Sequence, residues 1–242
     1  MNYSKNKLFI DKVAVSKVID KFGTPSYCYS YNKLKNNILQ FKKNFKKIDP
    51  LICFAVKANN NLTILNEIGK LGLGADVVSK GELVAAIKAK IHPKKIVFSG
   101  VGKTYEEIKF AVQKKILLIN AESQSEIETI LKVAKKNKRI IDIGIRVNPN
   151  VDAQTIKEIT TGKDSNKFGV SDKEVIRLIN HYKNSKYLNI KCLSVHIGSQ
   201  ITSNTPYLRM LKAIQKIIEI TNFNFEYVDL GGGMGINYGN SK

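Results

Sequence analysis

The sequence predicts an α/β protein, a TIM-type (β/α)8 barrel that stops before its eighth strand. Short apolar runs alternate with helical patterns along most of the 242 residues, and helix-starting motifs follow several of these runs. Such alternation indicates parallel strands joined by right-handed crossovers. The polar residues of interest stand at the ends of runs across the whole length, so a barrel fits better than an open sheet.

Seven apolar runs are predicted to be strands. They cover residues 51–57, 75–79, 95–99, 117–120, 142–147, 193–197 and 227–230. Four helix starts carry the capping-box spacing, in which a hydroxyl and a carboxylate each accept a backbone N–H. The pairs are Ser79 with Glu82, Thr104 with Glu107, Ser123 with Glu126, and Ser171 with Glu174.

Residues 1–45 do not join this alternation and are predicted to form an arm, separate from a barrel domain at 46–242. Within the arm we expect a turn at 22–25, a short strand at 26–30 and a basic helix at 33–47. The longest irregular stretch is 148–168. Loops of this length usually cover a site.

Composition narrows the function classes. The formal net charge is +20, but the lysines are spread through every helical pattern without an arginine-rich or aromatic stripe, so we expect no nucleic-acid partner. No window is apolar enough for a membrane span, and no leader is evident, which predicts a cytoplasmic protein. Cys28, Cys53 and Cys192 share no metal-binding spacing, so we expect neither a metal site nor a disulfide.

Lys57 closes the first apolar run. An ammonium at the end of a buried strand loses hydration, which lowers its pKa and favours the neutral amine that attacks carbonyls. The alternative is a lysine that extends from the strand end into water.

The second candidate site follows the last apolar run, where Gly231, Gly232 and Gly233 stand together. Glycines allow backbone N–H groups to close around a phosphate. The cluster has neither P-loop nor dinucleotide spacing, and a late glycine loop suits the phosphate site of a barrel. A flexible turn is the alternative.

Together the motifs resemble the pyridoxal-phosphate-dependent decarboxylases with an alanine-racemase-like barrel, most closely those acting on diaminopimelate. The segments that carry the resemblance, in order over about residues 20–240, are 27–30, 55–59, 74–82, 146–149, 161–162, 166–169, 196–200 and 229–233. The resemblance implies a homodimer that decarboxylates meso-2,6-diaminopimelate to L-lysine and CO2, with a β-domain after the barrel. Alternatives are a relative acting on arginine, ornithine or lysine, or a non-catalytic homologue that binds the cofactor.

The resemblance also implies roles for single residues. Lys57 would form the Schiff base with pyridoxal 5′-phosphate, and His196 would stack on its ring. Asp76 and Arg146 would lie around the ring, and Ser199 with Gly231, Gly232 and Gly233 would hold the phosphate. Asp76 could instead be a helix-flanking acid. Glu82, a possible supporting partner, is equally explained by its capping box.

The sequence departs from the family in two places. Ile156 stands where relatives often carry histidine, which weakens the choice of substrate. The Glu-Pro-Gly-Arg-type motif of the eighth strand is absent, as are the Cys and Tyr of the β-domain that reach across the dimer. We therefore expect residues 1–242 alone to be inactive.

Overall fold

The computed structural model describes residues 2–4, 6–45, 47–153 and 168–236. Its contacts divide the chain into two compact units, Met1–Ile52 and Cys53–Lys242. Most of the predicted long loop, including Ile156, lies outside the described residues.

The first unit holds a small antiparallel sheet that the sequence did not predict. Its strands are β1 (Asn2–Ser4), β2 (Lys7–Ile10) and β3 (Val13–Ala14), followed by helices α1 (Val15–Phe22) and α2 (Tyr31–Asn44). Ser30 starts α2 by accepting the Lys33 N–H, while its hydroxyl donates to Asp11 at 2.6 Å. The predicted strand at 26–30 was wrong: the segment pairs with no described strand, and its Tyr27 is 93% exposed.

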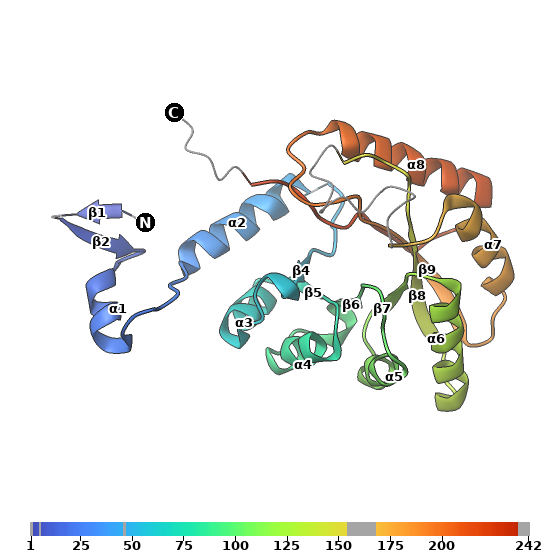
Figure 1. Ribbon diagram of the computed structural model, residues 1–242, viewed down its shortest axis with the longest axis horizontal. Helices are drawn as coiled ribbons and strands as arrows, with labels where there is room; N and C mark the ends of the chain where they lie inside the picture. The colour runs from blue at the N-terminus through green and yellow to red at the C-terminus, as the bar shows by residue number, and fades with distance from the viewer. Residues whose placement is uncertain (1, 5, 46, 154–167, 237–242) are drawn as a thin grey trace. The chain divides into compact units, whose positions relative to one another are not determined.

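The second unit is built on one parallel sheet of seven strands in sequential order. The strands are β4 (Cys53–Ala55), β5 (Gly74–Val77), β6 (Ile96–Phe98), β7 (Leu118–Ala121), β8 (Ile141–Val147), β9 (Leu188–Val195) and β10 (Tyr227–Asp229). A doubly wound sheet would reverse its order at a switch point. Sequential order instead curls the sheet into a half-barrel, as predicted, with β4 and β10 at the two edges of its described part (Figure 1).

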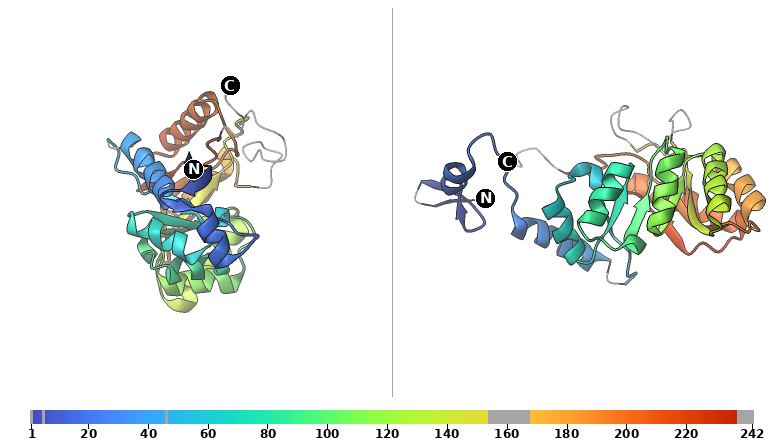
Figure 2. Two further views of the ribbon diagram at one scale, coloured as in Figure 1. Left: turned by 90° about the vertical axis from the view of Figure 1, so that its left-hand side faces the viewer. Right: turned by 90° about the horizontal axis from the view of Figure 1, so that it is seen from below.

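Helices follow the strands on the outside of this curve. They are α3 (Leu62–Lys70), α4 (Lys80–Lys88), α5 (Tyr105–Lys114), α6 (Gln124–Asn137), α7 (Asp172–Tyr182) and α8 (Thr205–Thr221). The right-hand view of Figure 2 shows the cyan-to-green helices side by side along the sheet. Each buries one apolar face: Leu83 on α4, Ile108 on α5 and Ile130 on α6 are fully buried in the core. Burial of this kind is the main stabilising contribution to the fold.

The predicted capping boxes formed only in part. At Thr104 the box is complete, with the hydroxyl and Glu107 both accepting backbone N–H groups. At Ser79, Ser123 and Ser171 the hydroxyl caps the helix as expected. However, the carboxylate of Glu82 accepts the Val78 N–H, one residue before the cap. The capping-box spacing therefore predicted where each helix begins more reliably than it predicted which backbone N–H the carboxylate accepts.

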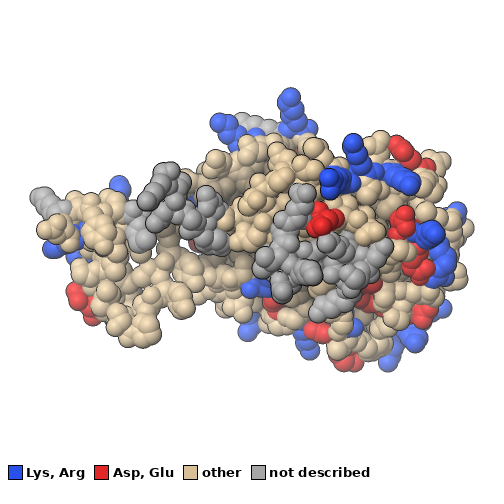
Figure 3. Space-filling model, turned by 45° about the horizontal axis from the view of Figure 1, so that its top comes forward, with Lys and Arg blue, Asp and Glu red and all other residues tan. Residues whose placement is uncertain are grey.

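Basic side chains lie in several separate groups, interspersed with acidic ones, on the face in Figure 3. Among the described helices, none is long and apolar enough to cross a membrane.

Candidate active site

The predicted site residues of the second unit stand at the carboxyl ends of its strands. Lys57 lies in a short 3-10 helix, Val56–Ala58, directly after β4, and Asp76 is the penultimate residue of β5. Arg146 is the penultimate residue of β8, and His196 directly follows β9. Because parallel strands end at the same edge, these side chains share one rim of the half-barrel.

Lys57 is exposed in the structure, so the expected loss of hydration at a buried strand end was wrong. The reason is that β4 ends at Ala55 and the chain turns outward before Lys57. The ammonium nevertheless lies close enough to act on two neighbours: it lowers the pKa of Asp76 and that of His196. Lys57 is therefore an accessible amine that faces titratable groups.

Asp76 is held by a short hydrogen bond, since the Ser99 hydroxyl donates to its carboxylate at 2.6 Å. Burial raises the pKa of Asp76 from 3.8 to about 6, and the nearby carboxylate of Asp229 adds to the rise. The Ser99 hydrogen bond and Lys57 oppose it. Asp76 can thus gain or lose a proton close to neutral pH, which a simple helix-flanking acid would not do.

His196 is neutral at pH 7. Burial, with the positive charges of Arg146 and Lys57, lowers its pKa from 6.5 to about 4. Its Nδ1 accepts the Gly232 N–H at 3.3 Å. An accepting Nδ1 in a neutral imidazole puts the ring hydrogen on Nε2. The glycine loop therefore selects the tautomer of His196.

The glycine loop packs tightly against the segment after β9. Gly231 and Gly233 have φ of +66° and +90°, and an added Cβ would lie 2.5 Å from Val195 O and 1.9 Å from Gly198 O respectively. At Gly232, by contrast, an added Cβ would meet nothing within 4 Å among the described atoms. The outer two glycines are needed for packing, whereas the middle one faces open space.

Ser199 stands in the segment that lies against this loop. Next to it, Ile201 N donates to Gly233 O at 2.9 Å, and the Gln200 side chain accepts the Ile236 N–H at 2.8 Å. Ser199 itself is half-buried. The predicted phosphate-binding residues therefore occupy two adjacent segments.

Arg146 is buried and ion-paired, with Nη1 2.7 Å from Glu122 Oε1. The other oxygen of Glu122 accepts the Gly169 N–H, and the guanidinium lies over the Phe168 ring at 4.8 Å. Because its other oxygen is held by Gly169, the Glu122 carboxylate presents a fixed partner to Arg146. Glu122, which follows directly after β7, was not predicted from the sequence.

A row of polar side chains inside the half-barrel was also missed. Asn120 donates to Ser99 at 3.2 Å and to Asp229 at 2.8 Å, and the Ser194 hydroxyl donates to Asp229 at 3.0 Å. With Asp76, these side chains come from or directly after five different strands. Their signal in the sequence was a polar residue within or at the end of an apolar run.

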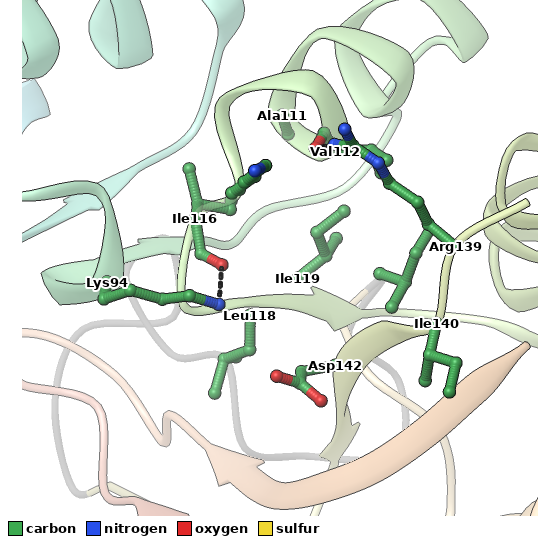
Figure 4. Close-up of a pocket in the computed structure, with 11 residues that line it drawn as sticks. Lys94, Ala111, Val112, Ile116, Leu118, Ile119, Arg139, Ile140 and Asp142 are labelled. Carbon is green, nitrogen blue, oxygen red and sulfur yellow. Dashed lines mark hydrogen bonds between the residues drawn. The ribbon is translucent and has the colours of Figure 1, made fainter. Parts of the chain in front are cut away.

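A cavity of about 300 Å³ lies away from this rim, where β7 and β8 begin (Figure 4). Two of its cations are bonded to backbone carbonyls: Lys94 to Ile116 O at 3.4 Å and Arg139 to Val112 O at 3.3 Å. Its lining includes no predicted site residue, so the chemistry is assigned to the opposite end of the strands.

Cys53 and Cys192 behave as small apolar residues, as expected. Burial raises the pKa of both thiols, that of Cys53 to about 12. Neither is a reactive thiolate at neutral pH.

The rim combines the accessible amine of Lys57, the neutral imidazole of His196 and the carboxyl of Asp76, whose pKa is about 6. Beside them lies the glycine loop, which has open space at its middle glycine. An accessible amine beside a glycine loop with open space next to it suits a ligand carrying both an aldehyde and a phosphate.

Comparison with known proteins agrees with this reading. Residues 31–242 match the family described as pyridoxal-dependent decarboxylase, pyridoxal binding domain. The diaminopimelate decarboxylase of Aquifex aeolicus is 40% identical over 244 residues, covering 98% of this chain and 57% of the relative. That of Helicobacter pylori strain J99 is 41% identical, covering 93% of this chain and 56% of the relative.

Solved structures give the same result. Diaminopimelate decarboxylase from Helicobacter pylori complexed with L-lysine superimposes with a TM-score of 0.90 at 39% identity, covering 94% of this chain and 59% of that one. The enzyme from M. jannaschii in co-complex with L-lysine superimposes with a TM-score of 0.91 at 34% sequence identity. The match covers 100% of this chain and 58% of that one. This chain spans a little over half the length of these relatives. It belongs to the family of pyridoxal-binding domains of the pyridoxal-dependent decarboxylases, whose cofactor is pyridoxal 5′-phosphate.

Proposed function

We propose that this protein catalyses the decarboxylation of meso-2,6-diaminopimelate to L-lysine and CO2 with pyridoxal 5′-phosphate. One observation carries the proposal: Lys57, Asp76 and His196 stand at the carboxyl ends of strands of one parallel sheet, and His196 Nδ1 accepts an N–H of the glycine loop. Four groups far apart in the sequence therefore form one site, and that site has both an amine and an anion-binding loop.

The residues fit the cofactor. Gly231 and Gly233 leave no room for side chains, while the open side at Gly232 leaves room for a phosphate beside the loop, whose Gly231 and Gly232 N–H groups donate to Asp229 and His196. The exposed amine of Lys57 would hold the aldehyde. When bound, pyridoxal phosphate supplies a carbonyl that bonds to amines and a ring that accepts the electrons released as CO2 leaves.

The chain's own residues then have separable tasks. Neutral His196 would offer an uncharged flat ring to the cofactor, and Arg146, held by Glu122, would supply a positive charge at the rim. Asp76, with a pKa raised by burial to about 6, places a titratable carboxyl on the strand next to the one that Lys57 follows. Ser199 would add a hydroxyl on the phosphate side.

The choice of substrate rests on the relatives. Several proteins named diaminopimelate decarboxylase are 36–41% identical to nearly the whole chain, and two solved relatives were crystallised with L-lysine. A viral arginine decarboxylase has the same fold, with a TM-score of 0.78 at 21% identity. Arginine, ornithine and lysine are therefore the substrates to test against diaminopimelate.

The test is CO2 release from a panel of these four amino acids. It should use the 242-residue chain, for which inactivity is expected, and, for the preference among substrates, the chain with any continuation that its reading frame encodes. We expect strong preference for meso-diaminopimelate, because a site built to hydrogen-bond a polar group rejects analogues without it by up to about 10⁴–10⁵. Comparable turnover of L-ornithine would contradict the proposal.

A homodimer, implied by the family resemblance, and a cytoplasmic location, predicted from the sequence, are further parts of this proposal. Analytical ultracentrifugation with and without cofactor tests the first, and cell fractionation tests the second.

A further inference from the structure

The polar row inside the half-barrel centres on Asn120, which is 1% exposed. Asn120 is on β7 and Asp229 is on β10, with β8 and β9 between them in the sheet. Their side chains nevertheless meet at 2.8 Å, because the sheet curls and both residues point into its interior. The contact joins residues 109 positions apart in the sequence.

The orientation of the Asn120 amide follows from its partners. The Ser99 hydroxyl gives its hydrogen to Asp76, so toward Asn120 its oxygen can only accept. Asp229 accepts through both of its carboxylate oxygens. Both contacts therefore require the NH2 group of the amide, and the reverse orientation would put two oxygens together.

This orientation leaves Asn120 Oδ1 buried without a hydrogen-bond partner among the described residues. A buried acceptor without a partner is destabilising. The fold nevertheless makes room for it: a Cβ on Gly144, the neighbour of Asn120 on β8, would lie 2.1 Å from Oδ1. The structure therefore has a glycine at position 144 in β8 and leaves Asn120 Oδ1 without a hydrogen-bond partner among the described residues. In this arrangement the Asn120 amide donates to Asp229.

Asp229 in turn holds the glycine loop. Its Oδ1 accepts the Gly231 N–H at 2.8 Å, while its Oδ2 accepts from Asn120 and from Ser194. Gly231 is the residue with φ of +66° at which the chain leaves β10 and turns into the loop. The position of this carboxylate therefore sets where the loop begins.

We propose that Asn120 is a positioning residue for the phosphate site: by anchoring Asp229 it holds the turn at Gly231 and, through it, the glycine loop. The inference rests on the proposed function, since it assigns the phosphate of pyridoxal phosphate to that loop. Ser99 extends the same hydrogen-bond chain to Asp76, so the loop and the carboxyl beside Lys57 share one support.

The first readout needs no ligand. In two-dimensional amide NMR of the ligand-free chain, Asn120→Ala should move the Gly231 resonance and increase its hydrogen exchange, because the Asp229 carboxylate loses one of its two side-chain donors. Asn189→Ala is the matched control: Asn189 also donates to a carboxylate, Asp142 at 2.9 Å, but on the opposite end of β9. It should leave Gly231 unchanged. An unmoved Gly231 resonance in folded Asn120→Ala protein overturns the inference.

The second readout is affinity for pyridoxine 5′-phosphate, which carries the phosphate and ring but no aldehyde for Lys57. Asn120→Ala should raise the Kd about tenfold to a hundredfold, the range expected for a lost hydrogen bond to a charged group. Asn189→Ala should bind as the parent does. Equal weakening in both variants would mean a general loss of stability and would overturn the assignment.

A third variant keeps the test decisive if Asn120→Ala folds poorly. Asn120→Asp has nearly the same shape, but its introduced carboxyl can donate to Asp229 only when protonated. The ratio of its Kd to that of the parent should therefore rise between about pH 5 and pH 8, whereas a purely steric role predicts a flat ratio. If the parent binds neither pyridoxine phosphate nor pyridoxal phosphate, the proposed function fails, and the Gly231 resonance still decides the role of Asn120.

Discussion

Replacing Asp76 with asparagine should remove the loss of folding stability that ionisation of the buried Asp76 carboxyl causes as the pH rises. Burial raises the pKa of Asp76 from 3.8 to about 6, so between these values the folded chain binds a proton that the unfolded chain has released. The stabilisation linked to this proton is complete below about pH 3.8 and is lost as pH rises through about 6. At about 1.36 kcal/mol per pKa unit, the difference between 3.8 and 6 corresponds to about 3 kcal/mol.

Asp76→Asn keeps the shape and the acceptor for Ser99 but cannot ionise. Its free energy of unfolding relative to the parent should therefore increase from pH 4 to pH 8 by up to about 3 kcal/mol. Urea unfolding of the cofactor-free proteins measures this by circular dichroism, since the chain has no tryptophan. Using the difference from the parent cancels the other titrating groups, including His196, whose lowered pKa favours the folded state as pH rises from 4 to 6.5.

The control is Glu106→Gln, which removes an exposed carboxylate paired with Lys109 at 3.3 Å. Exposed pairs contribute about 0–1 kcal/mol, so this variant should show little change with pH. A constant difference between Asp76→Asn and the parent at every pH would refute the account of Asp76 as a buried, proton-binding carboxyl.

Three further predictions concern single residues. Gly233→Ala should weaken pyridoxal-phosphate binding at least about tenfold, because left-handed backbone costs an alanine roughly 1–2 kcal/mol and its Cβ would meet Gly198 O; an unchanged affinity in fluorescence titrations would contradict the packing account. The His196 ring protons should titrate near pH 4 in NMR, and a midpoint near 6.5 would mean that the ring is solvated. Lys103→Met should lower the free energy of unfolding by about 3–5 kcal/mol, because it leaves Glu126 buried without its partner at 2.5 Å; a loss below about 1 kcal/mol would show that the pair is not desolvated.

The strands and the glycine loop could be predicted because their signals are local. An apolar run bounded by polar residues marks a buried strand wherever it pairs, and all seven predicted runs are strands of one sheet. Lys57 was correctly located after the first strand but wrongly expected to be buried. Its exposure depends on where β4 ends, and strand ends are set by pairing with β5 rather than by the run itself.

The supports of the site could not be predicted in the same way. Asn120 and Asp229 meet only because the sheet curls, and no spacing in the sequence encodes a contact across 109 positions. Glu122 is similar, since its partners Arg146 and Gly169 lie on or after the next strand. The predicted ligand-contacting residues lie in recognisable sequence motifs. The residues that position them can be identified only from their contacts in the folded chain.

The central claim is that Lys57 and the glycine loop form one cofactor site. Pyridoxal phosphate should be added to the folded chain, the adduct reduced with borohydride, and the attachment point located by peptide mass spectrometry. We predict one reduced pyridoxyl group on Lys57, its loss in Lys57→Ala, and strong weakening in Gly233→Ala with the lysine intact. Label spread over other lysines, or unchanged in Lys57→Ala, would contradict the claim.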